Sequence, residues 1–178
     1  MQNSSWYAVY TKPFWENRVT RMLIKANLKT YCPLQKTLRQ WSDRKKVVYT
    51  PLFRSYVFVN ITAQEIPLVK QVYGIISFVS NHGKPAIIRT EEIETIRQFN
   101  NDYEDIMIQK VEIPDHSQTG PLHVLPAERS GKVVQLPGDR VEVYLPSFGF
   151  RLSARKTRTE HLEQPAGIPA KQKNKKTA

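Results

Sequence analysis

The N-terminal half of the chain runs through short alternations of apolar and polar residues, broken by one stretch of helical spacing. The segment WYAVY, residues 6–10, predicts a short strand that Lys12 and Pro13 close. Over residues 14–28 the spacing changes to three and four, which predicts a helix ended by Asn27. Its apolar stripe comprises Trp15, Val19, Met22, Leu23 and Ala26. A basic stripe follows the same spacing on the exposed side and comprises Arg18, Arg21 and Lys25.

The segment PLFRSYVFVNI, residues 51–61, predicts a strand with two apolar faces. One face would carry Phe53, Val57, Val59 and Ile61. The other would carry Leu52, Tyr56 and Phe58, together with Arg54 and Asn60. A strand that faces water on one side shows polar residues there, so this strand must be covered twice. The sequence leaves open whether the second cover is the protein's own helices or a partner.

Three further elements follow from local signals. Thr62 and Glu65 resemble a capping box, but Pro67 favours a helix that starts near Glu65 and runs to about residue 72. Residues 76–88 read as a hairpin that turns at residues 81–83. Thr90, with the acidic pair after it, caps a third helix. Its core face would be Ile93, Ile96 and Phe99.

The second half of the chain predicts a change of architecture. We expect an N-terminal domain over residues 1–104 and, because the sequence then turns polar and acidic, a linker over 105–118. Residues 119–164 hold short strand candidates separated by Gly and Pro turns, as in a small β-barrel. The Pro-, Gly- and Lys-rich segment 165–178 is expected to be a disordered basic tail.

Charge narrows the class of partner. The chain carries a formal charge of +11, and residues 1–60 hold eleven Lys and Arg against two acidic residues. A basic cluster, Arg44, Lys45 and Lys46, lies in a loop or at a hairpin tip between strands. Such concentration suggests a polyanion, most simply nucleic acid, although a solvated basic surface would look the same.

Catalytic signatures are missing from the sequence. The four histidines are scattered without metal spacing, and the seven glycines form no phosphate-cradling loop. The single cysteine, Cys32, excludes an internal disulfide and is expected to be a buried structural thiol in the reducing cytoplasm. No apolar run is long enough to span a membrane. We therefore expect no enzyme, no cofactor and no metal.

Several motifs in order resemble the N-terminal (NGN) domain of NusG-type transcription factors. They are an opening Trp6-Tyr7 strand, the strand from Pro51 to Val59, the segment from Gly74 to Val79, and Pro85-Ala86. The segment WSDRKK is similar to specialised paralogues that antiterminate polysaccharide or capsule operons. GKVVQL, RVEVYLPSFGFRLSA and TEHLE resemble the later strands of the family's KOW barrel. The resemblance implies an α+β fold: an NGN α/β sandwich, made of an antiparallel sheet with three helices, and a small KOW-type β-barrel.

For function, the resemblance implies an elongation and antitermination factor that suppresses pausing and termination. An apolar patch would bind the clamp helices of the largest subunit of RNA polymerase, through Tyr10, Phe53, Tyr56 and Phe58. Aromatic side chains suit such a patch because they bury a large area at low entropy cost. We expect a cytoplasmic monomer that acts at particular operons and binds no membrane.

The resemblance also implies that the chain binds the displaced non-template DNA strand, and its charge suggests contact with upstream DNA. The candidate residues are Lys12, Arg18, Arg21, Lys25, Arg44, Lys45 and Lys46. Phe148 lies in the Phe-Gly turn through which the barrel would bind a ribosomal protein or a termination factor. Whether the barrel covers the apolar patch is left open. The alternative is a ribosome-associated or RNA-binding KOW protein, for which affinity would follow residues 119–178.

Overall fold

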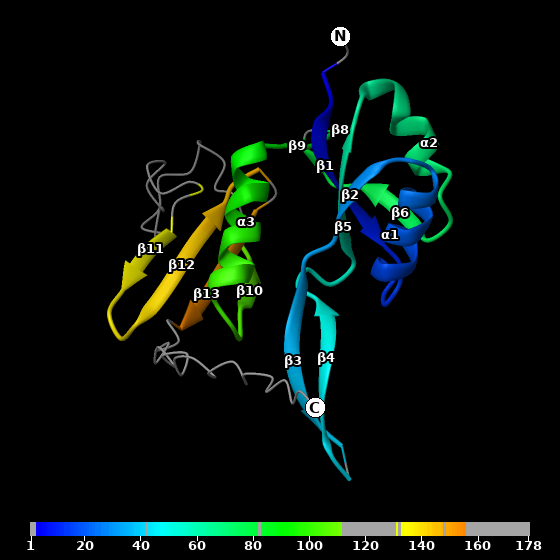
Figure 1. Ribbon diagram of the computed structural model, residues 1–178. Helices are drawn as coiled ribbons and strands as arrows, with labels where there is room; N and C mark the ends of the chain where they lie inside the picture. The colour runs from blue at the N-terminus through cyan, green and yellow to red at the C-terminus, as the bar shows by residue number, and fades with distance from the viewer. Residues whose placement is uncertain are drawn as a thin grey trace, which may run out of the picture.

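The computed structural model describes residues 3–41, 43–81, 83–111, 131, 133–147 and 149–155, and it combines helices with two main antiparallel sheets (Figure 1). The first sheet has the strand order β2-β5-β1-β6, and β9 also pairs with β1. Its strands are β1 (Ser5–Thr11), β2 (Lys29–Tyr31), β5 (Tyr56–Ile61), β6 (Ile75–Phe78) and β9 (Ile87–Ile88). The mixed α/β architecture expected from the sequence is confirmed.

Helices α1 (Glu16–Lys25) and α2 (Ile66–Lys70) cover one face of the first sheet. Val19 and Leu23 of α1 are buried against Val57, Val59 and Ile61 of β5. The helix is shorter than the expected 14–28. It ends because Asn27 adopts a left-handed conformation (φ 60°), which lets the Leu28 N–H return to the Leu23 carbonyl at 3.0 Å. The expected apolar stripe is right at Val19 and Leu23, whereas Ala26 is exposed.

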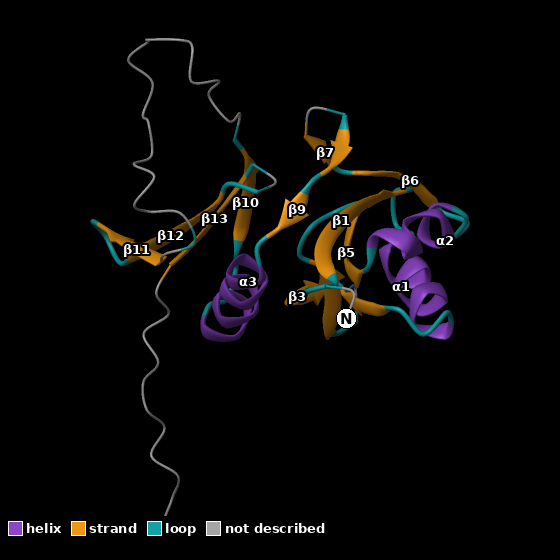
Figure 2. Ribbon diagram, turned by 90° about the horizontal axis from the view of Figure 1, so that it is seen from above, coloured by secondary structure: helices purple, strands orange, loops and turns teal. Residues whose placement is uncertain are grey.

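The opposite face of the first sheet is covered by helix α3 (Thr90–Asp102) and by a second sheet. Trp6, Ala8 and Phe58 of the first sheet share one apolar core with Ile93, Ile96 and Phe99 of α3. Side chains of the second sheet complete this core: Val141, Val143, Leu145, Phe150, Leu152 and Ala154. Figure 2 shows α3 between the two sheets. Both apolar faces predicted for residues 51–61 are therefore covered within the chain.

The second sheet has the order β10-β13-β12-β11. Its strands are β10 (Met107–Lys110), β11 (Val133–Leu136), β12 (Arg140–Leu145) and β13 (Phe150–Arg155). The expected linker is wrong over residues 107–110, because this stretch pairs with β13 and so forms an edge strand. Within the described residues the strands form an open path, so closure into a barrel stays a prediction. The tail at 165–178 and most of the segment 112–132 lie outside the described residues.

Two hairpins extend the fold. Strands β3 (Leu34–Gln40) and β4 (Lys45–Pro51) pair along their full length and reach away from the first sheet, as Figure 1 shows. The basic cluster at residues 44–46 lies at the far end of this hairpin, as expected. Strands β7 (Ser80–Asn81) and β8 (Lys84–Pro85) form a small hairpin around the turn expected there.

The helix starts follow their capping signals with small differences. The Thr62 N–H donates to the Glu65 carboxylate at 2.8 Å, which caps a short 3₁₀ turn, η1 (Ala63–Glu65). Pro67 then falls in the first turn of α2, where its missing N–H costs little. Thr90 is the first residue of α3 rather than its cap. The cap position is occupied by Arg89.

The turn before β5 corrects the expected position of Phe53. The strand begins at Tyr56, and residues 52–55 form a turn in which Ser55 has a φ of 64°. Phe53 therefore does not share a face with Val57, and it packs on the other side, against Phe58. Glu16 of α1 fixes this turn, because its buried carboxylate accepts the Ser55 N–H at 2.6 Å.

We predict that Glu16→Ala lowers the free energy of unfolding by about 1–3 kcal/mol, because the partly buried Ser55 N–H loses its acceptor. Chemical denaturation of the full chain measures the change. Glu91→Ala is the matched control, since Glu91 also lies in the first turn of a helix but is exposed. If both variants lose the same free energy of unfolding, Glu16 stabilises the fold only through its interaction with the helix dipole.

Candidate protein and nucleic-acid interfaces

Four aromatic residues expected at one surface do come together, and we call them the aromatic cluster: Tyr10, Phe53, Tyr56 and Phe58. Tyr10 lies opposite Tyr56 in the β1–β5 register, and their ring centroids are 5.3 Å apart. Phe53 meets Phe58 edge-on at 5.4 Å. The sheet register and the turn at residues 52–55 together gather these rings on the face away from α1.

Most of the aromatic cluster is buried inside the chain. Phe53 and Phe58 are 2% and 0% exposed, Tyr56 is half-buried, and Tyr10 is 38% exposed. Phe150 of β13 covers the cluster, with its ring centroid 5.6 Å from that of Phe53 and 5.3 Å from that of Tyr56. The second cover of this strand, which the sequence left open, is therefore supplied within the chain. Alternation could not identify the cover, because Phe150 is 94 positions from Tyr56 in the sequence.

Polar contacts hold the second sheet against α3. Glu92 is 1% exposed, and its carboxylate accepts the Ser147 N–H at 3.1 Å and the Arg89 N–H at 3.3 Å. The Thr95 hydroxyl donates to the Gly131 carbonyl at 3.1 Å. A buried carboxylate is stable only while its hydrogen bonds persist, so Glu92 ties the second sheet to α3. The sequence pattern indicates only a helix-capping role for Glu92, because Ser147 lies 55 positions away in the chain.

Helix α3 also reaches the rings of the first sheet. The Arg97 guanidinium lies 4.8 Å from the centroid of the Tyr31 ring, and Tyr31 stacks on Phe58 at 6.1 Å. Burial raises the pKa of Tyr31 to about 12, although the Arg97 charge lowers it in part. Burial likewise raises the pKa of Tyr56, with Tyr10 as the lesser cause. These phenols therefore stay neutral at physiological pH.

The basic candidates divide into two surfaces. Arg18, Arg21 and Lys25 are exposed on one side of α1, and with Lys12 at the start of that side they form what we call the α1 stripe. The Arg18 guanidinium lies 4.4 Å from the centroid of the Trp15 ring. Trp15 is half-buried beside the core under α1, so its expected core role holds in part.

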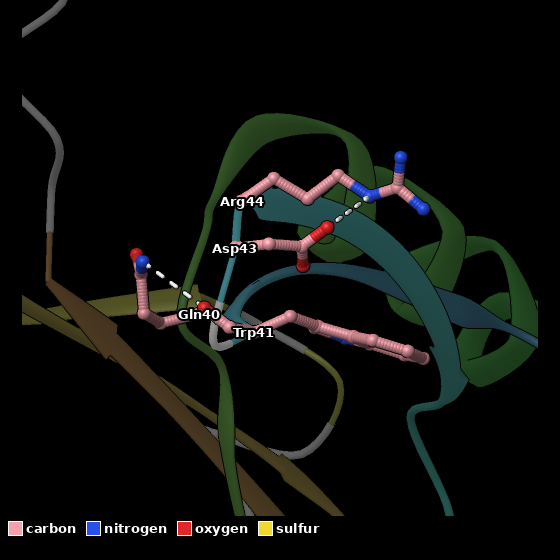
Figure 3. A network of polar contacts seen from close by, with 4 residues as sticks. All are labelled: Gln40, Trp41, Asp43 and Arg44. Atoms are coloured by element: carbon pink, nitrogen blue, oxygen red, sulfur yellow. Dashed lines mark hydrogen bonds and ion pairs between the residues drawn. The ribbon is translucent and has the colours of Figure 1, made fainter.

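The second basic surface is the hairpin tip: Arg44, Lys45 and Lys46. Figure 3 shows the Arg44 Nε next to the Asp43 carboxylate, at 3.7 Å, and both side chains are largely exposed. The Trp41 N–H donates to the Arg44 carbonyl at 2.9 Å, and the Lys46 ammonium lies 5.4 Å from the Trp41 ring centroid. Figure 1 places the tip far from α1, so one nucleic-acid segment would have to be long to touch both surfaces.

The remaining observations concern Phe148, Cys32, metal binding and membrane spanning. Phe148 lies outside the described residues. Burial raises the pKa of the Cys32 thiol to about 11, which fits a half-buried structural cysteine rather than a nucleophile. Within the described ranges no group of three His, Cys, Asp or Glu side chains is placed to hold a metal ion. No described helix is long and apolar enough to cross a membrane.

Comparison with known proteins now identifies the family. Residues 4–97 match the family described as "NusG: Transcription termination factor nusG". A solved structure titled "Domain interaction in Thermotoga maritima NusG" is similar at 20% identity, with a TM-score of 0.43. The likeness covers 86% of this chain and 94% of that one. No curated protein matches the sequence. Since the matched residues make up more than half of the chain, it belongs to the NusG family of transcription elongation and antitermination factors.

Proposed function

We propose that this NusG-family chain binds the clamp helices of the largest subunit of RNA polymerase through its aromatic cluster. The observation that carries the proposal is the gathering of Tyr10 and Tyr56 with Phe53 and Phe58 on one face of the first sheet. Large rings gathered at one surface are the groups that dominate the binding energy of protein interfaces. By holding the clamp closed, the factor suppresses pausing and termination without catalysis or a cofactor.

Polymerase and the second sheet would compete for this face. Phe150 occupies the position over Phe53 and Tyr56 that a partner's apolar side chains would take. Release requires loss of the two ring contacts, of the apolar core that β12 and β13 share with the first sheet and α3, and of the Glu92–Ser147 and Thr95–Gly131 hydrogen bonds. The apolar surface then exposed must be covered again, and the clamp helices supply that cover.

The α1 stripe would hold the displaced non-template strand of the transcription bubble, and the hairpin tip would contact upstream duplex DNA. Both surfaces are exposed and basic, as phosphate contact requires. The chain would act as a cytoplasmic monomer at particular operons, including those for polysaccharides or capsules. An N-terminal domain over residues 1–104, and a C-terminal contact through Phe148 with a ribosomal protein or termination factor, belong to the same proposal.

We predict that Phe150→Ala in the full chain tightens binding to purified core RNA polymerase by about tenfold. Two aromatic contacts of about 0.5–1.5 kcal/mol each no longer oppose exposure of the cluster. Titration with fluorescently labelled protein measures the affinity. Phe78→Ala is the control, since it truncates a buried ring in the other core.

Adding Tyr10→Ala and Tyr56→Ala to the Phe150→Ala chain should then abolish binding. Phe53 is left intact here, so that the variant does not lose a second buried Phe beside Phe150, since each such truncation costs about 3–5 kcal/mol of stability. If Phe150→Ala leaves the affinity for polymerase unchanged, the second sheet does not compete with polymerase for the aromatic cluster. Absence of polymerase binding, with RNA bound instead, would favour the ribosome-associated or RNA-binding alternative.

We expect Arg18→Gln, Arg21→Gln and Lys25→Gln together to reduce the salt dependence of binding to an elongation complex. The logarithmic slope against salt concentration should fall by about 2, since each single-strand phosphate contact contributes about 0.7. A control chain with Lys70, Lys84 and Lys110 changed to Gln loses the same charge from other exposed positions. If both variants lower the salt slope by the same amount, the effect depends only on net charge and the α1 stripe has no special role.

The hairpin tip has a separate prediction. Arg44→Gln, Lys45→Gln and Lys46→Gln together should lower the slope by about 2–3 on a template with upstream duplex. The same change should have no effect once the upstream duplex has been removed from the template. An effect that survives this removal would place the tip against polymerase or the bubble instead.

A further inference from the structure

Phe14 adopts a conformation that its residue type disfavours. Its φ is 63°, in the left-handed region, and its side chain is 95% exposed. The other described non-glycine residues with positive φ are Asn, Ser or Asp, whose short polar side chains tolerate this region better. An exposed ring gains nothing from a core, so neither backbone preference nor packing accounts for Phe14. Strain of this kind is often found at functional positions.

The residues around Phe14 form an aromatic and cationic surface. Trp15 meets Tyr73 edge-on, with centroids 5.1 Å apart, and Tyr73 is 61% exposed. The Lys12 ammonium lies 4.4 Å from the Tyr73 ring centroid and donates to the Tyr73 hydroxyl at 3.4 Å. These contacts join the segment before α1 to the turn before β6.

Gly74 permits this close approach. A Cβ at this position would lie 2.6 Å from the Trp15 Cε3 atom, and its φ of 100° also suits glycine alone. The Lys12 N–H donates to the Gly74 carbonyl at 2.9 Å, which fixes the backbone of both segments. The surface is therefore preorganised before any ligand arrives.

The charges on this surface are of one sign. Lys12 and Arg18 flank the rings, whereas the nearby Glu16 carboxylate is buried and bonded to the Ser55 N–H. Exposed rings beside cations are the chemistry that binds single-stranded nucleic acid, because bases stack on rings and phosphates meet cations. Duplex DNA would not fit, since its bases are already stacked.

We propose that Phe14 and Tyr73 form a stacking platform for an unpaired base, with Lys12 and Arg18 binding the flanking phosphates. The inference rests on the proposed contact between the α1 stripe and the displaced strand, and it deepens that contact. The stripe supplies affinity for any sequence, whereas the platform makes binding depend on an unpaired base. The Phe14 strain persists because it holds the ring out toward that base.

The test measures binding of the full chain to a twelve-nucleotide single-stranded DNA that carries 2-aminopurine, whose fluorescence is quenched on stacking. Phe14→Gly should weaken binding about tenfold and remove the quenching, while the salt slope stays unchanged. Phe14→Trp should restore both. Because glycine relieves the backbone strain, the melting temperature of Phe14→Gly should equal or exceed that of the parent.

Three outcomes would overturn the platform. If Phe14→Gly binds and quenches like the parent while the α1 stripe variant loses its salt slope, the platform is wrong and the stripe stands. If neither the parent chain nor its variants bind the single strand, both the platform and the proposed contact with the displaced strand are wrong. If Phe14→Gly loses affinity equally for a duplex of the same sequence, the ring does not stack on an unpaired base.

Discussion

The two-sided burial of β5 is the constraint on which the rest of the structure depends. Val57, Val59 and Ile61 pack under α1 and α2, whereas Phe58 packs toward α3 and the second sheet. A strand with two apolar faces cannot be left half open without exposing large side chains to water. Every other layer of the molecule is arranged to meet this requirement, and any partner of the aromatic face must meet it too.

A small number of polar contacts positions the apolar layers. Glu16 holds the turn at residues 52–55 from one side of the first sheet, and Glu92 holds the second sheet from the other. Both carboxylates are buried and accept backbone N–H groups, so each couples a helix to a segment far away in the sequence. This arrangement fixes Phe53 and brings Phe150 over the aromatic cluster. The same contacts would therefore set the free-energy cost of exposing it.

Charge is kept apart from these cores. The α1 stripe and the hairpin tip project from separate elements, and neither includes a residue of the aromatic cluster. Mutations could therefore alter the proposed protein-binding surface and the proposed nucleic-acid-binding surfaces independently. The surface around Phe14 combines the exposed rings of Phe14 and Tyr73 with cations, and the hairpin tip likewise places Lys46 beside the exposed ring of Trp41.

Local sequence determined the elements that depend on short-range physics. The α1 and α3 core stripes, the capping box at Thr62, the hairpin with its basic tip, and the double apolar character of β5 all follow from residue type and spacing. The family and its mixed fold followed from motifs in order. Only the tertiary structure decided that Phe53 turns toward Phe58, that residues 107–110 join the second sheet, and that Phe150 covers the cluster. These outcomes depend on contacts between residues far apart in the chain, which alternation along one strand does not encode.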